Sequence, residues 1–254
     1  MAERLLMVVD TATITTCGCA ETLFLSFGNG NGNRQKPRKF PVSGNGNGIP
    51  HITGPHSPRG DFNTSWVTSC EIINPDHYIA GENGYNLYTL KRDLDAKTEK
   101  ERARLVTCGQ FYLGEMINCI YAGELQDAPV DSSVSLQGQL LYGTVDGGLG
   151  VIVGLEQPVF DYLHELQLRL GKTIHNCLRI SHSKYREFQS EARRENYHGF
   201  IDGDLIESLF ELTREQIGQL IKGIHFKSCN PKVPSVELSV EEVMKMVEDL
   251  SRVH

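Results

Sequence analysis

Glycines are concentrated between Gly143 and Gly154, and a glycine-rich segment is a natural place to look for a phosphate-binding loop. Such loops use glycine because backbone N–H groups must approach the phosphate closely at the start of a helix. The segment fits neither the GxGxxG pattern nor the Gly-Lys-Ser/Thr ending of a P-loop. Residues 140–145 and 149–155 are both β-prone, so we predict a β-hairpin with its turn at residues 146–148.

Cysteines and histidines are the other residues with chemical potential, but their spacing argues against a metal site or a nucleophile. The seven cysteines include no CxxC pair, which predicts free thiols in a reducing compartment, although Cys17 and Cys19 could form half of a metal site. His164 and His175 would lie about 16 Å apart along a continuous helix, too far to share a metal. His175 and Cys177 are too generic a pair to nominate as base and nucleophile, and neither GxSxG nor HExxH occurs. We therefore expect no catalytic residue, no metal and no cofactor.

The charge distribution argues against autonomous binding of nucleic acid. The chain has a net charge of -7, and residues 1–60 carry a net +3, so residues 61–254 carry -10. An acidic body repels phosphate, and any nucleic acid is therefore expected to be met through a partner protein. No apolar run is long enough to span a bilayer, and residues 5–9 are too short for a signal-peptide core. We expect neither membrane contact nor secretion.

Residues 1–60 are predicted to form a divergent, flexible segment. Two apolar runs, residues 5–9 and 23–27, could be strands, but residues 28–48 contain two glycine/asparagine repeats. These residues lose much backbone entropy on folding and offer no apolar surface in return. The basic sequence RQKPRK at residues 34–39, between the repeats, is either a solvated linker or a nuclear-import or polyanion-binding patch.

Residues 61–155 read as short strands separated by turns. With the hairpin, the runs give about seven strands in this segment, which suits a sandwich, a barrel or propeller blades of about four strands each. The charged residues 92–104 are expected to form an exposed loop or helical turn between strands. A ring needs at least about four blades, so the propeller interpretation predicts a partial propeller of two to three blades. The predicted strands before the hairpin cover residues 66–73, 77–80, 85–91, 106–113 and 115–122.

Residues 156–254 have helical periodicity and predict a small C-terminal bundle. Apolar residues recur at helical spacing from Phe160 to Leu170, and residues 181–190 could form a shorter polar helix. The fold class is therefore β plus α, with the two halves meeting at the hairpin. Capping signals mark the starts of three further helices at Asp204, at Thr213 with Gln216, and at Ser239 with Glu242.

Two side chains on predicted strands have two possible roles. Trp66 is the only tryptophan, and it is either a core anchor or an interface hot spot. Asn118 lies among apolar residues, where it either satisfies a core hydrogen bond or faces a pocket.

Six segments carry a resemblance to a known family. They are DFNTSW (61–66), AGENGYNLY (80–88), QFYLGEMIN (110–118), LLYGTVDGGLG (140–150), GFIDGDLIESLFELTR (199–214) and VEDLSRVH (247–254). In this order they resemble the C-terminal end of the damage-specific DNA-binding protein 1 family, over residues 61–254. Related splicing and polyadenylation subunits share the architecture but are less similar.

The resemblance implies an adaptor that is not an enzyme. In the family, propellers and a helical domain bridge a cullin to interchangeable substrate receptors, some of which recognise damaged DNA. This chain resembles the last blades of the third propeller and the helical domain, so we expect receptor contact, little cullin contact and only indirect contact with damaged DNA. The expected location is the nucleus and also the cytoplasm. The alternative is a nucleic-acid-binding subunit of an RNA-processing complex.

The family's receptor pocket maps onto one set of residues in this sequence. Tyr85 and Met116 stand where the family commonly has phenylalanine, and Cys119 stands where it has valine, so the wall remains apolar but changes shape. Because preceding blades are not matched, we expect an unpaired sheet edge near Trp66 and a helical domain that folds without a closed propeller. The mapped pocket residues are Trp66, Asn83, Tyr85, Met116, Asn118, Cys119 and Val145.

Overall fold

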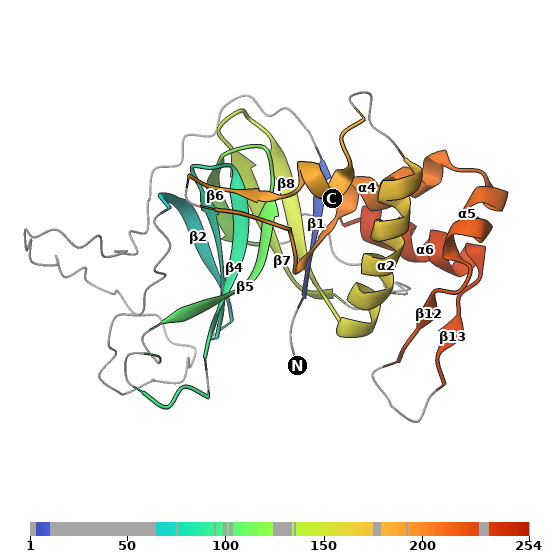
Figure 1. The fold of residues 1–254 in the computed structure, drawn as a ribbon, viewed down its shortest axis with the longest axis horizontal. Helices are drawn as coiled ribbons and strands as arrows, with labels where there is room; N and C mark the ends of the chain where they lie inside the picture. The colour runs from blue at the N-terminus through green and yellow to red at the C-terminus, as the bar shows by residue number, and fades with distance from the viewer. Residues whose placement is uncertain are drawn as a thin grey trace, which may run out of the picture.

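The computed structural model shows two larger, mainly antiparallel sheets beside a group of helices (Figure 1). This arrangement confirms the mixed β and α fold class, with partial propeller blades followed by a C-terminal helical part. None of the helices in the described ranges is long and apolar enough to cross a membrane. The structure describes residues 4–10, 65–74, 76–93, 95–98, 101, 104–123, 134, 136–174, 179–191, 193–228 and 234–253.

The first sheet is a four-stranded antiparallel meander in chain order. Its strands are β2 (Val67–Asn74), β3 (His77–Glu82), β4 (Asn86–Arg92) and β5 (Leu105–Tyr112). Apolar side chains on one face, including the fully buried Ile79, form the contact with the second sheet. Each of these strands was predicted as a short run between turns or loops, and the sheet has the form of one propeller blade.

The second sheet contains the predicted glycine-rich hairpin. Its strands β6 (Ile117–Ala122), β7 (Leu136–Thr144) and β8 (Leu149–Leu155) pair in chain order. The strand β1 (Arg4–Asp10) pairs antiparallel with β8, and β11 (Phe200–Asp202) pairs in parallel with β1. The N-terminal strand therefore supplies the fourth strand of a second blade.

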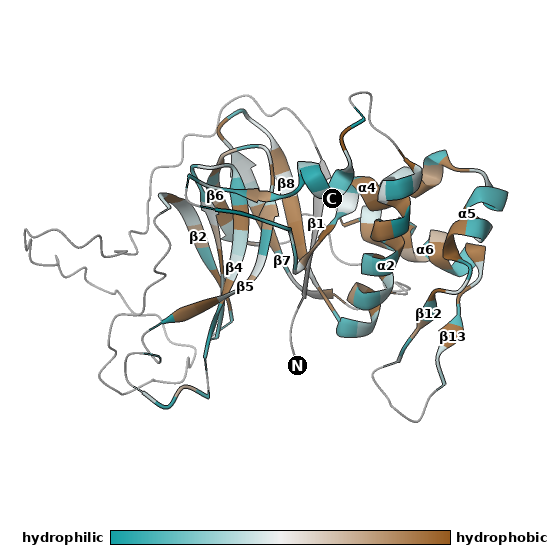
Figure 2. Ribbon diagram, in the orientation of Figure 1, coloured by the Kyte–Doolittle hydropathy of each residue, from teal (hydrophilic) through white to brown (hydrophobic). Residues whose placement is uncertain are grey.

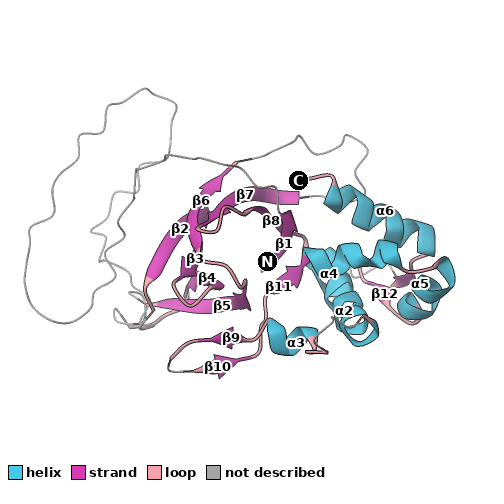
Figure 3. Cartoon of the chain, turned by 90° about the horizontal axis from the view of Figure 1, so that it is seen from above, coloured by secondary structure: helices cyan, strands magenta, loops and turns pink. Residues whose placement is uncertain are grey.

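The possible strand at residues 5–9 is therefore present, whereas the rest of the predicted flexible segment lies outside the described residues. That includes residues 23–27, both glycine/asparagine repeats and the basic residues 34–39. The first strands of the two blades, β2 and β6, lie side by side when the molecule is seen from above (Figure 3). Among the described strands, β2 has β3 as its one hydrogen-bonded neighbour within its sheet.

The helical part begins directly after β8. Helix α2 (Gln157–Thr173) buries Leu163 and Leu166 completely in one cluster with the second sheet, including Val153, and with the other helices. Burying a leucine side chain contributes about 1.5–3 kcal/mol, so this apolar stripe holds the two parts together. The hydrophobic residues accordingly lie where the helices face one another and the sheet (Figure 2).

Two of the three predicted capping sites are confirmed. Thr213 opens α5 (Arg214–Ile221) and Ser239 opens α6 (Val240–Ser251), each with a complete capping box. The prediction that Asp204 caps a helix is wrong, because α4 (Gly203–Glu207) begins one residue earlier and Asp204 lies in its first turn. A 3-10 helix, η1 (Ser208–Glu211), follows α4 directly.

The predicted polar helix at residues 181–190 is shorter than expected. Helix α3 (His182–Tyr185) is followed at once by β9 (Phe188–Gln189), which pairs with β10 (Arg194–Glu195). This part of the chain returns to the first blade, because Gln110 and His198 exchange two backbone hydrogen bonds of 2.8 and 3.0 Å. A second short hairpin joins β12 (His225–Phe226) to β13 (Val236–Glu237).

Candidate functional site

Three loops and the residues just before β2 lie at the same end of the two blades, and we call them the rim. In an antiparallel blade the start of one strand lies beside the end of the next, so alternate turns gather at one end. The pairs Val67 with Glu82 and Asn86 with Tyr112 establish this in the first blade, and Ile117 with Thr144 establishes it in the second. The rim consists of residues 65–66, 83–85, 113–116 and 145–148.

Trp66 is held by its main chain while its side chain projects from the protein. The Asn83 N–H donates to the Trp66 carbonyl at 3.0 Å, and the Trp66 N–H donates to Asn83 Oδ1 at 3.3 Å. The indole is nevertheless 77% exposed. Trp66 is therefore not a core anchor, and an exposed indole on a fixed main chain is typical of a binding surface.

Tyr85 adopts a backbone conformation that non-glycine residues rarely adopt. Its φ angle is 63°, in the left-handed region, so it lies in the turn and does not begin the strand as the sequence indicated. The Tyr85 carbonyl accepts hydrogen bonds from the N–H groups of Leu113 and Gly114, at 2.9 and 3.2 Å. These two bonds stabilise the turn and connect it to the loop between the blades, while the Tyr85 ring remains exposed.

The second blade contributes Met116 and Val145, which are joined through their main chains. The Val145 N–H donates to the Met116 carbonyl at 2.9 Å, and the Val145 side chain is 55% exposed. The hairpin turn is closed by Thr144, whose hydroxyl accepts from the Gly148 N–H at 2.9 Å. Gly147 has a φ of 91°, which explains the glycine there. The glycine-rich hairpin is thus a turn of the rim.

Asn118 and Cys119 lie just below the rim on β6. A register shift in the pairing of Ile117 and Cys119 with β7 marks a bulge, and Asn118 within it is exposed. Asn118 therefore faces the surface and is not a buried core residue. Cys119 is half-buried, and its sulfur packs close to Gly143, 3.1 Å from where a Cβ would stand.

Behind the rim, a buried ion pair joins the helical part to the loop between the blades. Arg186 Nε donates to Asp202 Oδ2 at 2.6 Å, and His182 Nε2 lies 2.7 Å from the same oxygen. Arg186 also donates to the Leu113 carbonyl at 3.0 Å. Burial acts to raise the pKa of Asp202, but the hydrogen bonds and positive charges of His182 and Arg186 outweigh it and lower the pKa. We call Asp202, Arg186 and His182 the junction.

A second link fixes the turn that carries Asn83 and Tyr85. The Asn86 side chain donates to the Gln189 carbonyl at 2.7 Å and accepts from the Gln189 N–H at 3.3 Å. Asn86 Nδ2 also donates to the buried Glu82 carboxylate. The strand β9 from the helical part therefore supports the rim from outside the blade.

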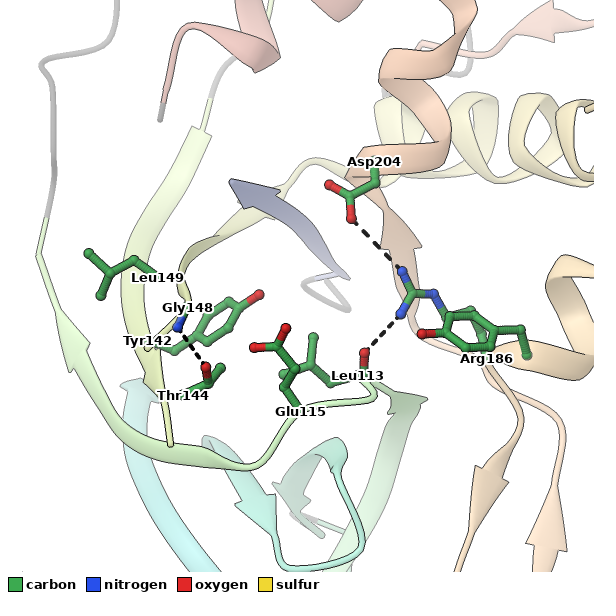
Figure 4. Close-up of a pocket in the computed structure, with 9 residues that line it drawn as sticks. Leu113, Glu115, Tyr142, Thr144, Gly148, Leu149, Arg186 and Asp204 are labelled. Carbon is green, nitrogen blue, oxygen red and sulfur yellow. Dashed lines mark hydrogen bonds and ion pairs between the residues drawn. The ribbon is translucent and has the colours of Figure 1, made fainter. Parts of the chain in front are cut away.

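A cavity of about 150 Å³ lies between the second blade, the interblade loop and the helical part (Figure 4). Sequence reasoning did not find it, because Arg186 and Asp204 come from the helical part and no local motif connects them with Tyr142. The residues that line it are Leu113, Glu115, Tyr142, Thr144, Gly148, Leu149, Tyr185, Arg186 and Asp204.

Five of the seven pocket residues mapped from the sequence lie in the rim, and the other two lie on the adjoining strand β6. Hydrogen bonds join Trp66 to Asn83 and Met116 to Val145, while Tyr85 is joined to the loop that leads to Met116. Asn118 is exposed on the adjoining strand, and Cys119 is half-buried beside it. The arrangement offers exposed apolar groups on a fixed backbone, which suits contact with another protein.

Among the residues that the structure describes, no three His, Cys, Asp or Glu side chains are grouped to hold a metal ion. Cys17, Cys19, His175 and Cys177, which the sequence singled out, lie outside those residues.

Comparison with known proteins relates the chain to one family. The family described as the CPSF A subunit region matches residues 59–211. DNA damage-binding proteins 1b and 1a of Arabidopsis thaliana are 35% and 36% identical to this chain over 194 residues, or 76% of it. DNA damage-binding protein 1 of Solanum lycopersicum is 34% identical over the same length. The chain spans about a sixth of these relatives, since the matched part is 17% of each.

Proposed function

The chain belongs to the family of the CPSF A subunit region, and from this premise we propose that it is a scaffold segment whose function is protein–protein contact. More specifically, we propose that the chain is part of a cullin-RING ubiquitin-ligase adaptor and that it docks substrate receptors on the rim. The relatives are named DNA damage-binding proteins, which supports a role in DNA damage recognition and repair. Damaged DNA would be reached through the receptor, and the place of action would be the nucleus and also the cytoplasm.

The exposed indole of Trp66 is the observation that carries this proposal. A tryptophan that is 77% exposed leaves a large apolar surface in water, and burying apolar surface contributes about 25 cal/mol per Å². Its backbone is already fixed by Asn83, so the segment around Trp66 loses little conformational freedom when a partner covers the indole. Such preorganised aromatic groups commonly dominate the binding energy of an interface.

The rest of the rim supplies the features expected around such an anchor. Tyr85 and Val145 add exposed apolar surface on either side of the interblade loop. The exposed amides of Asn83 and Asn118 can give directional hydrogen bonds to a partner backbone. This combination of apolar anchors and a few polar groups favours one binding geometry over others.

A nucleic-acid-binding subunit of an RNA-processing complex is the second candidate, and the name of the matching family favours it. The charge of -10 over residues 61–254 argues against direct contact with phosphates. A salt-dependent mobility shift of DNA or RNA by the purified chain would support this second function.

The proposal is tested by measuring the affinity of purified substrate receptors of cullin-RING ligases for the chain and for Trp66→Ala. We expect at least tenfold weaker binding by the variant, as for a hot-spot residue. Val106→Ala is the matched control, because Val106 is an exposed apolar residue at the opposite end of the same blade. Equal affinity of all three proteins for every receptor, or no binding by any, would overturn receptor docking. Little cullin should be recovered with any of them.

A further inference from the structure

The cavity beside the rim contains a buried hydroxyl group with no hydrogen-bond partner among the described residues. The Tyr142 side chain is 2% exposed, and its phenol oxygen is unpaired there. The oxygen points into the space between Glu115, Asp204 and Arg186 (Figure 4). Buried polar groups nearly always have a hydrogen-bond partner, so this oxygen indicates a place for a ligand atom.

The position of the Tyr142 ring is built into the hairpin. Opposite Tyr142 on β8 stands Gly150, and a Cβ there would lie 2.2 Å from the ring. The ring therefore occupies the space that a side chain at position 150 would fill. This packing holds the hydroxyl group at the wall of the cavity.

The cavity is acidic. Two carboxylates, Glu115 and Asp204, line it, whereas the one cationic lining residue, Arg186, is paired at 2.6 Å with Asp202 outside the lining. Arg186 also forms a longer ion pair with Asp204, at 4.0 Å. Burial raises the pKa of Tyr142, and the charges of Asp204 and Glu115 raise it further, so the phenol stays neutral and its oxygen can accept a hydrogen bond.

We propose that this cavity receives the positively charged end of one lysine or arginine side chain of the protein that docks on the rim. Tyr142 Oη accepts a hydrogen bond from the ammonium or guanidinium group, and Glu115 and Asp204 face its charge. An anion would instead meet two carboxylates. The volume of about 150 Å³ suits the head of one side chain, since a single water needs only about 10–15 Å³ of such space. The identity of the docking protein rests on the proposed function, whereas the preference for a cation does not.

The preference for a cation is tested with the full chain and three small probes. Nα-acetyl-lysine amide and Nα-acetyl-arginine amide carry the proposed groups, and Nα-acetyl-norleucine amide is the uncharged control of similar length. We expect at least one charged probe to shift the backbone amide signals of Gly148 and Leu149 in a saturable manner, with no effect of norleucine amide. No shift by either charged probe, or equal shifts by all three, would show that the cavity has no preference for a cation and would overturn the proposal.

Removal of one oxygen atom then tests whether the charged probe binds in this cavity. Tyr142→Phe removes the unpaired oxygen and keeps the ring, so the chain should fold while its affinity for the charged probe falls about tenfold. Tyr162→Phe is the matched control, because Tyr162 on α2 also has a buried hydroxyl without a described partner but does not line the cavity. Glu115→Gln should weaken charged-probe binding by a similar factor. Unchanged affinity of Tyr142→Phe would overturn the assignment.

The receptor assay separates this proposal from the function on which it rests. If Trp66→Ala abolishes receptor binding and Tyr142→Phe leaves it unchanged, the cavity assignment fails and receptor docking stands. If the charged probe binds and no receptor does, the cation site stands and the receptor proposal fails. Weaker receptor binding by both variants, with Tyr162→Phe unchanged, is the expected outcome.

Discussion

The rim and the junction are neighbours in the molecule, but the rim exposes apolar side chains to water whereas the junction buries charged side chains. At the rim, Trp66 leaves an apolar side chain in water although its backbone is held by hydrogen bonds. At the junction, Asp202 and Arg186 place charges in the interior, where each is paired. Apolar surface left exposed is available for a partner, whereas buried and paired charges serve the fold. The comparison predicts large stability effects at the junction and large binding effects at the rim.

Arg186→Met should have the largest effect on stability. It leaves the Asp202 carboxylate buried with His182 as its remaining side-chain partner and removes the bond to the Leu113 carbonyl. Breaking a buried pair by removing one partner costs about 3–5 kcal/mol in the free energy of unfolding. Urea denaturation measures this loss. Arg214→Ala, which breaks the exposed pair with Glu241, is the control and should cost less than about 1 kcal/mol. Similar losses for both variants would contradict the distinction between junction and surface.

The second-largest expected effect is the loss of the stabilisation by Asp202 at acidic pH. Because the folded-state pKa of Asp202 is lowered, the unfolded chain binds this proton more readily, and the contribution of Asp202 to stability is present above its unfolded pKa of about 3.9. That contribution is lost as the pH falls through the folded pKa. The difference in unfolding free energy between the wild type and Asp202→Asn should therefore shrink below about pH 4. A difference that stayed constant down to pH 2 would show that the Asp202 charge does not stabilise the fold.

The sequence was sufficient where the controlling signal is local. The β7–β8 hairpin follows from a glycine turn between two β-prone runs, and the capping boxes at Thr213 and Ser239 follow from residues three positions apart. The Asp204 prediction failed because two aspartates stand two residues apart and β11 extends to the first of them, Asp202, which becomes the N-cap residue.

Partners that are distant in the chain could not be deduced in the same way. Apolar residues suggested a strand at residues 5–9, but nothing local indicated that β1 would pair with β8 and β11. The junction likewise joins Arg186 to a carbonyl of the interblade loop more than 70 residues earlier. The cavity depends on such distant contacts, because Arg186 and Asp204 lie beside Tyr142 only after the chain has folded.

Substitution of the hairpin glycines should have effects on stability of intermediate size. Gly150→Ala places a Cβ 2.2 Å from the Tyr142 ring, and overpacking of this kind typically costs about 1–3 kcal/mol. Gly147→Ala meets no atom within 4 Å, so its cost comes only from the φ of 91° and should be about 1 kcal/mol. Thermal unfolding of the two variants measures the difference. A larger loss for Gly147→Ala would mean that the Tyr142 ring can move aside, and it would weaken the case for a fixed hydroxyl in the cavity.

Trp66→Ala should have the smallest effect on stability and so complete the comparison. The hydrogen bonds with Asn83 use the main chain of Trp66, and they remain when the indole is removed. A mostly exposed side chain contributes little to the folded state, so the free energy of unfolding should change by less than about 0.5 kcal/mol. Urea denaturation of the protein used in the receptor assay gives this value directly. A loss of 2 kcal/mol or more would make the indole part of the fold, and any weaker receptor binding by the variant would then reflect unfolding instead of a lost contact.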